Sequence, residues 1–323
     1  MKAGRYVWSM SGGLLLLGCL AVLSLRLGAV PAPFSVLWEE AVTGEGFILQ
    51  YRLPRLIIAV LVGINMAVAG AILQAMTKNP LAAPDIVGIS AGGGLASVIL
   101  ILLYPGFQPF MLPLVAFGGA LVASLIVYSL SYDKGMKPEQ LALGGVAVSA
   151  GLQALITFFI VKYALDAAQA LVWLKGSLYA RSWQHVHMLW PWTLAGCTAA
   201  LVSWRQLNLL LMSEDTVRGL GMRVQLARFL LLITAAGLAA SAVAVAGTIG
   251  FVGLVIPHAA KLIAGSDSRF YLPLAALMGA ILVTTADTIG RIILPPIEVP
   301  AGIITALIGA PYFVYLLVRR KVV

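Results

Sequence analysis

The stretch LARFLLLITAAGLAASAVAVA, from Leu226 to Ala246, decides the fold class of this chain. It is almost continuously apolar, and as one α-helix it is long enough to cross a hydrocarbon core about 30 Å thick. A helix satisfies its own backbone hydrogen bonds, which an apolar environment requires. A strand of a membrane barrel would instead alternate apolar and polar residues over about 10 positions. The stretch therefore predicts a membrane-spanning helix.

Similar apolar runs recur along the whole chain. Of its 323 residues, 61% are hydrophobic and 10% are charged, whereas a soluble domain carries about 25% charged residues. We predict an all-α polytopic membrane protein with about ten transmembrane helices in a single domain over residues 1–323. The predicted spans are residues 7–28, 54–76, 86–104, 110–131, 140–162, 189–204, 226–246, 248–264, 272–290 and 297–318.

The basic residues indicate how the chain is oriented. An even number of spans places both termini on one side, and that side would hold about two thirds of the 21 Lys and Arg residues. Because cytoplasmic loops carry the excess of basic residues, we predict that both termini are cytoplasmic. The net charge of +9 then reflects topology, and no nucleic-acid partner is expected. The first apolar run is too long for a cleaved signal peptide and is predicted to be a retained span.

Motifs for chemistry on this chain are sparse. The sequence has no GxxxxGK[ST], so we predict no ATPase domain and no bound cofactor. It also lacks HExxH, which argues against an intramembrane metalloprotease. His185 and His187 form an isolated H-x-H, which is too weak a pattern to predict a metal site.

Two loops on the predicted cytoplasmic side have unusual sequences. In residues 205–225, Ser213 is a candidate helix N-cap, and Gly221 can end the helix. The short helix between them is either a surface helix or a docking element for a cytoplasmic partner. In the other loop, Pro80 and Pro84 interrupt helical structure, which predicts either a tight turn or a constriction of a pathway.

Charged residues near the predicted outer surface also stand out. Arg52 and Arg55 begin the second span, and Arg291 ends the ninth. They are either interfacial anchors or contacts for an acidic partner or anionic substrate. Placed at the membrane surface, Arg55 is expected to tolerate charge reversal without loss of the fold. Asp287 lies four residues before Arg291, which predicts an ion pair on one helical face.

Many short motifs, in order along nearly the whole chain, resemble those of the FecCD-type permeases of ABC importers. This group includes ferric-siderophore, haem and cobalamin permeases. The matching residues are Arg52-Leu-Pro-Arg55, Gly70, Gln74, Asn79-Pro-Leu-Ala82, Pro84, Gly88, Leu220-Gly221, Gly247-x-Ile249-x-Phe251-Val-Gly-Leu254, Pro257-His258, Asp287, Arg291, Glu298-x-Pro300-x-Gly302 and Gly309-x-Pro311-x-Phe313.

The resemblance implies a ten-helix permease of the bacterial inner membrane. It implies a second permease, identical or paralogous, two cytoplasmic ATPase subunits that bind ATP, and an extracytoplasmic substrate-binding protein. The expected activity is uptake of ferric siderophores by ATP-driven alternating access. The same machinery importing cobalamin or haem is the alternative. A further alternative is a proton-coupled secondary transporter that uses Asp85 or Asp287 as its carrier site.

The resemblance also implies roles for matching positions. Docking of the binding protein is expected at Arg52, Arg55 and Arg291, and a cytoplasmic gate at Asn79 and Leu81. The elements expected to couple the permease to the ATPase are Ser213, Glu214, Asp215, Leu220 and Gly221. The chain departs from the family around the acidic pair Glu214-Asp215. The family often has Gly before this pair and Ala after it. Here Met212-Ser213 precedes the pair and Thr216-Val217 follows it, which leaves the choice of ATPase partner open.

Overall fold

The structure is a computed structural model that describes residues 3–28, 30–85, 87–132 and 137–319. Within these residues it is built from helices. They are α1 (Ala3–Arg26), α2 (Phe34–Thr43), the π-helix η1 (Ile48–Arg52), α3 (Leu53–Met76), α4 (Ile89–Leu103), α5 (Met111–Leu130), α6 (Pro138–Lys162), α7 (Ala168–Leu174), α8 (Trp183–Val202), α9 (Trp204–Leu210), α10 (Glu214–Gly219), α11 (Val224–Ala246), α12 (Val252–Ala264), α13 (Ser268–Ile292) and α14 (Ala301–Arg319).

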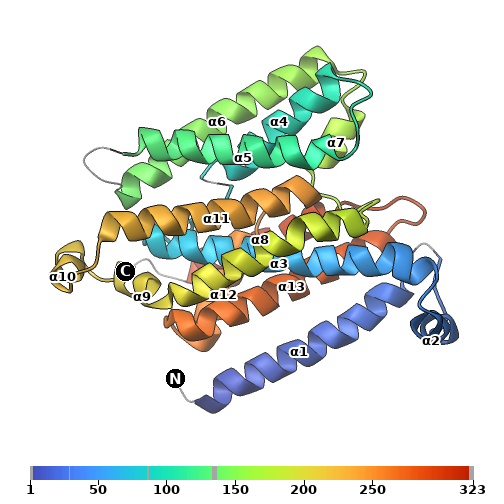
Figure 1. The fold of residues 1–323 in the computed structure, drawn as a ribbon, viewed down its shortest axis with the longest axis horizontal. Helices are drawn as coiled ribbons and strands as arrows, with labels where there is room; N and C mark the ends of the chain where they lie inside the picture. Colours follow the sequence, from blue (N-terminus) through green and yellow to red (C-terminus); the bar gives the residue numbers. More distant parts are fainter. Residues whose placement is uncertain (1–2, 29, 86, 133–136, 320–323) are drawn as a thin grey trace.

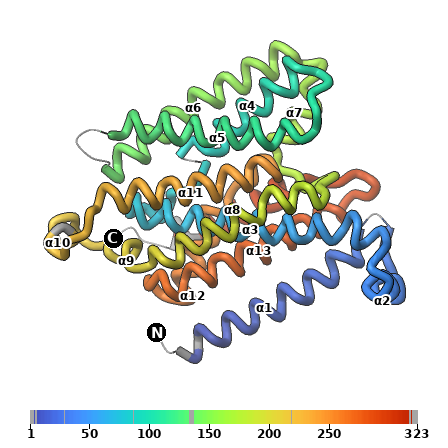
Figure 2. Tube along the Cα trace, in the orientation of Figure 1, coloured from blue at the N-terminus to red at the C-terminus, as the bar shows by residue number. Residues whose placement is uncertain are grey.

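The long helices run side by side, and α3 lies at the centre of the bundle (Figure 1). It packs against α8, α11, α12 and α13, which explains why most of its side chains are buried. Helices α4, α5 and α6 form a layer on one side, and α1 packs along α13 on the other. Figure 2 shows α10 and the start of α1 at one end of the bundle, the α10 end, and α2 at the opposite end, the α2 end.

Each of the ten predicted spans coincides with one helix, and the prediction of an all-α polytopic membrane protein is confirmed. In the described residues, six helices are long and apolar enough to cross a membrane: Tyr6–Arg26, Ile48–Met76, Met111–Leu130, Pro138–Lys162, Val224–Ala246 and Ser268–Ile292. The shorter apolar helices are Ile89–Leu103, Val252–Ala264 and Ala301–Tyr315. The remaining predicted span coincides with α8.

Five helices, α1, α8, α12, α13 and α14, begin four or more residues away from the predicted start, and two of these differences have a local explanation. Helix α8 begins at Trp183 rather than at 189, because Ser182 and His185 form a capping box at its start. Helix α12 begins at Val252 rather than at 248. The backbone just before it is not helical, since Gly247 has φ +73° and Phe251 has φ +67°. The short helices α2 and α7 were not predicted, and α9 is separate from α8.

Small residues let α3 and α13 approach closely. A Cβ added at Gly63 would lie 2.2 Å from the carbonyl oxygen of Gly279, and one at Gly279 would lie 2.2 Å from that of Gly63. Close backbone approach of this kind is a common way to pack helices in membranes.

We expect Gly63→Leu to lower the free energy of unfolding by about 1–3 kcal/mol, because the two backbones would have to separate. The measurement is the midpoint of thermal unfolding in detergent. The matched control is Gly18→Leu, since a Cβ at Gly18 meets no atom within 4 Å. Equal midpoints for the two variants would contradict the close packing of α3 and α13.

Candidate functional site

A cluster of buried charges joins α3, α13 and the segment before α14. The Arg55 Nη2 atom lies 2.8 Å from Asp287 Oδ1 and 2.8 Å from Glu298 Oε2. Arg291 Nε lies 3.2 Å from Asp287 Oδ2, which confirms the predicted pair. The side chains of Asp287 and Arg291 are only 3% and 5% exposed. Two guanidinium groups and two carboxylates therefore balance one another's charge. Burying the guanidinium groups without the carboxylates, or the carboxylates without the guanidinium groups, would be costly.

The other predicted docking residue, Arg52, belongs to the same end of the bundle. Its Nη1 donates to the carbonyl oxygens of Leu25 (2.8 Å) and Arg26 (2.9 Å), and its Nη2 donates to that of Val30 (2.5 Å). These acceptors lie at and just beyond the end of α1, where helical carbonyls lack intrahelical partners. Arg52 thus fixes the end of α1 against the start of α3.

The three arginines singled out from the sequence are therefore brought together, and each has partners within the chain. Arg291 also donates to Ser24 Oγ (2.6 Å) and to the carbonyl oxygen of Leu27 (3.2 Å). The Arg55 side chain is 13% exposed and ion-paired, so the expectation that it tolerates charge reversal without loss of the fold is revised. Their role in docking a binding protein stays a prediction.

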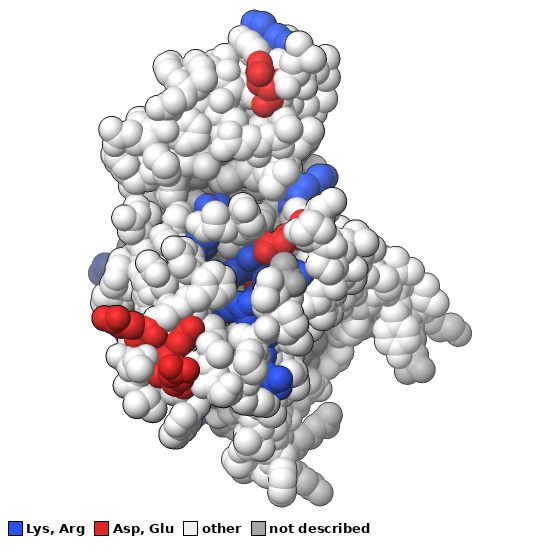
Figure 3. Space-filling view, turned by 90° about the vertical axis from the view of Figure 1, so that its right-hand side faces the viewer, with Lys and Arg blue, Asp and Glu red and all other residues white. Residues whose placement is uncertain are grey.

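A fourth arginine, Arg181, lines the same cavity and was not singled out from the sequence. It lies in the loop between α7 and α8, and the cavity of about 530 Å³ also has Arg52, Arg55, Arg291 and Glu298 in its wall. Figure 3 views the molecule from this end and shows basic side chains gathered in a hollow. Burial and the nearby Arg55 lower the pKa of Arg181 to about 10. The sequence places Arg181 among the few basic residues of the predicted outer side, but its position in a loop gave no reason to single it out from them.

At the α10 end, the predicted short helix is present as α10. The carbonyl oxygen of Ser213 accepts from Val217 N–H (3.1 Å), and the Ser213 hydroxyl pairs with that of Thr216 (2.7 Å). Gly221 has φ +79°, as expected of a residue that ends a helix. Leu220 is 63% exposed. The role of this helix in coupling to an ATPase stays a prediction.

Besides the packing of buried Val217 in the core, two polar contacts among the described residues tie the α10 region to the rest of the bundle. Glu214 lies 3.5 Å from Arg228 of α11, whose guanidinium is nearly buried. Just before α10, the carbonyl oxygen of Met212 accepts from Lys78 Nζ at 2.5 Å. The second tie connects α10 with the loop that follows α3.

That loop contains the two predicted gate residues. The Asn79 side-chain oxygen accepts from the backbone N–H of Leu81 (2.9 Å), which forms a tight turn. Lys78 adopts φ +50°, and Leu81 is exposed. The prediction of a tight turn is confirmed, whereas a gating role stays a prediction.

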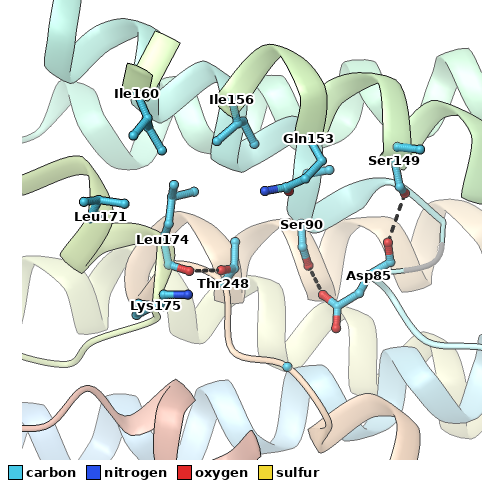
Figure 4. A pocket seen from close by; sticks show the side chains of 13 residues that line it. Asp85, Ser90, Ser149, Gln153, Ile156, Ile160, Leu171, Leu174, Lys175 and Thr248 are labelled. Atoms are coloured by element: carbon cyan, nitrogen blue, oxygen red, sulfur yellow. Dashed lines mark hydrogen bonds between the residues drawn. The ribbon is translucent and has the colours of Figure 1, made fainter. Parts of the chain in front are cut away.

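A second cavity, of about 570 Å³, lies between α6, α7 and the non-helical segment before α12 (Figure 4). Its polar wall includes Asp85, Ser90, Ser149 and Gln153. The Ser90 hydroxyl donates to the Asp85 carboxylate, and the Ser149 hydroxyl donates to the Asp85 carbonyl oxygen at 3.1 Å. The Asp85 side chain is thereby held in place by α4.

The H-x-H pair has a local structural explanation. The His185 Nδ1 atom lies 3.3 Å from the backbone nitrogen of Ser182 and 3.1 Å from its hydroxyl, in the capping box of α8. Among the described residues, no group of three or more His, Cys, Asp or Glu side chains is arranged to hold a metal ion.

Comparison with known proteins identifies related sequences over almost the full length. The family described as the FecCD transport family matches residues 14–319. The Fe(3+)-citrate import system permease protein YfmE of Bacillus subtilis (strain 168) is 44% identical over 302 residues, which cover 92% of this chain and 91% of that protein. The Fe(3+) dicitrate transport system permease protein FecD of Escherichia coli (strain K12) is 40% identical over 311 residues, with 95% and 97% covered.

Relatives with other cargoes and a solved structure also match. The cobalamin import system permease protein BtuC of Halobacterium salinarum is 40% identical over 285 residues, with 87% of this chain and 75% of that protein covered. A solved structure described as an inward-facing metal-chelate type ABC transporter superposes with a TM-score of 0.86. It is 29% identical and covers 97% of this chain and 99% of its own.

Proposed function

This chain belongs to the FecCD transport family, and from that premise we propose that it is the permease through which an ABC importer takes up a ferric siderophore. It is a multi-pass protein of the bacterial inner membrane, and the permeases of its family are not themselves enzymes. The observation that carries the proposal is the match, over nearly the whole length of both chains, to permeases that import Fe(3+)-citrate. The likeness to a metal-chelate type transporter supports the same class of cargo.

The proposed assembly contains two permeases, identical or paralogous, two cytoplasmic ATPase subunits and an extracytoplasmic binding protein. We place the α10 end in the cytoplasm and the α2 end outside, in accord with the distribution of basic residues. Helix α10, with exposed Leu220 at its end, is then accessible to the ATPase. The cavity lined by Arg52, Arg55 and Arg291 is accessible to the binding protein.

The contacts at the α10 end suggest how ATP hydrolysis on the partner subunits reaches the pathway. A displaced α10 would move the Met212 carbonyl, to which Lys78 is bonded. Lys78 directly precedes Asn79, and the Asn79 turn sets the position of Leu81. The proposed gate and the coupling helix are therefore linked through the Lys78 side chain. This chain contributes no ATP site to that step.

The alternatives differ in what they require. Import of cobalamin or haem would use the same machinery, and related permeases include one for cobalamin. A proton-coupled transporter needs a carboxylate that is free to act as a carrier. Asp287 is held by Arg55 and Arg291, and Asp85 is bonded to Ser90, so these contacts favour the ABC importer.

The test is uptake by a strain that lacks the gene, with and without a restored copy. The strain is offered labelled ferric citrate, several ferric siderophores, ferric haem and cobalamin. We expect loss of uptake of one ferric chelate, rescued by the restored gene. Loss of cobalamin or haem uptake alone would replace the proposed cargo, and unchanged uptake of every substrate with the gene expressed would contradict the proposal.

A further inference from the structure

The surface where α8 and α9 meet α11 carries two adjoining cavities with basic walls. Helix α8 packs along α11, and α9 follows α8 at the α10 end of the bundle (Figure 1). A cavity of about 210 Å³ has Arg223 and Gln206 in its wall. A neighbouring cavity, of about 570 Å³, has Arg205 and the same Gln206 in its wall, so the two adjoin. Among the described residues, no carboxylate lines either cavity.

The two arginines in these walls keep their charge available to a ligand. Both side chains are exposed, and neither has an ion pair or a hydrogen bond with another described residue. The carboxylates of this end are placed elsewhere, since Asp267 is ion-paired with Arg269 at 2.7 Å, and Glu214 and Asp215 of α10 lie outside both walls. Helix α11 begins directly after Arg223, and its N-terminal end adds a partial positive charge. The surface therefore favours an anion.

The rest of both cavity walls is apolar and open to the outside of the bundle. Leu226 and Leu230, one turn apart on α11, are 49% and 55% exposed and line the first cavity. Leu201 and Val202, at the end of α8, are 45% and 72% exposed and line the second. Exposed apolar side chains on membrane-spanning helices lie in the hydrocarbon core. The cavities therefore lie where the hydrocarbon core gives way to the lipid headgroups.

Trp204, which lines the second cavity, marks the same level. Its partly buried ring lies between two guanidinium groups, with its centroid 5.2 Å from that of Arg205 and 4.5 Å from that of Arg269. Tryptophan is enriched at the boundary between the hydrocarbon core and the headgroups. Unpaired arginines, an interfacial aromatic ring and an apolar wall thus follow one another in the order of the phosphate, glycerol and acyl parts of a phospholipid.

We propose that this surface binds an anionic phospholipid, whose phosphate is held by Arg205 and Arg223 and whose acyl chains lie along α8 and α11. A guanidinium presents two parallel donors that match two phosphate oxygens. Basic pockets between spans on the cytoplasmic side are a known place for lipid headgroups. In the orientation proposed above, the lipid belongs to the cytoplasmic leaflet. The site requires the membrane location of the chain, and it is independent of the cargo.

The test is native mass spectrometry of the full-length permease in detergent, with phosphatidylglycerol or phosphatidylcholine added. We expect the wild type to bind phosphatidylglycerol at least about fivefold more tightly, because the phosphatidylcholine headgroup has no net charge. Arg205→Gln combined with Arg223→Gln should weaken phosphatidylglycerol binding at least about tenfold and remove the preference. Lys137→Gln is the matched control, since it removes one positive charge from an exposed site outside both cavities, just before α6. It should leave both affinities unchanged.

Thermal unfolding of the same proteins shows whether the double variant is folded. Because neither arginine has a partner to lose among the described residues, the midpoint without lipid should equal that of the wild type. Phosphatidylglycerol should raise the midpoint of the wild type but not that of the double variant, since only the wild type binds it tightly.

Three results would overturn the proposal. One is equal affinity of the wild type and the double variant for phosphatidylglycerol. Another is an equal loss of affinity in Lys137→Gln, which would show an effect of net charge rather than a site. The third is competition by soluble glycerol 3-phosphate as effective as that by phosphatidylglycerol, which would show a phosphate site that makes no use of the apolar wall.

Discussion

Arg55→Glu is expected to destabilise the folded permease severely, lowering the free energy of unfolding by about 3–5 kcal/mol. The substitution removes both ion pairs of Arg55 and places a third carboxylate beside Asp287 and Glu298. Asp287 is almost fully buried, so water does not replace the lost partner. The measurement is the midpoint of thermal unfolding in detergent, together with the amount of folded permease in the membrane.

A charge swap separates this electrostatic effect from a steric one. Combining Arg55→Glu with Glu298→Arg restores one opposite-charge pair at a position where the native atoms lie 2.8 Å apart. We expect the double variant to recover part of the lost midpoint. An unchanged midpoint in Arg55→Glu alone would show that the buried cluster contributes little to stability.

Leu220→Arg is expected to reduce ATP-driven uptake at least about tenfold, which corresponds to about 1.4 kcal/mol of lost coupling. Leu220 is 63% exposed beyond the end of α10, so the new charge alters the surface offered to the ATPase rather than the core. The abundance and thermal midpoint of the permease should therefore remain at wild-type values. Uptake is measured in cells with the variant expressed to the same amount as the wild type.

Leu165→Arg is the matched control for that experiment. Leu165 is 99% exposed in the turn between α6 and α7, so the same chemical change is made away from α10. Uptake by the control should be normal. If Leu220→Arg also transported normally, α10 would not be the element that couples the permease to ATP hydrolysis.

The long helices could be predicted because hydropathy is a local property of the sequence. At the start of α12, where the structure departs from the prediction, a tertiary contact also contributes. The non-helical segment before α12 is held by α7, since the Thr248 hydroxyl donates to the Leu174 carbonyl oxygen at 2.5 Å. Phe251 takes its unusual backbone conformation against Gly309 of α14, where a Cβ would lie 2.5 Å from the phenylalanine side chain.

In the candidate site too, contacts between residues close in sequence could be predicted, whereas contacts between distant residues could not. The pair of Asp287 and Arg291 could be predicted because the two residues lie one helical turn apart. The partners of Arg55 could not be, since Asp287 and Glu298 lie more than 200 positions away along the chain. Without those partners Arg55 resembled a surface residue. Arg181 shares a cavity with these residues only because the α7–α8 loop folds over the end of α3.

The most direct test of the account is transport by the purified components in proteoliposomes. The permease is reconstituted with its ATPase subunits and supplied with the binding protein and a labelled ferric chelate. The account predicts uptake that requires ATP inside the vesicles and is abolished by a catalytically inactive ATPase, with no requirement for a proton gradient. Uptake by the permease alone, driven by a proton gradient without ATP, would contradict it.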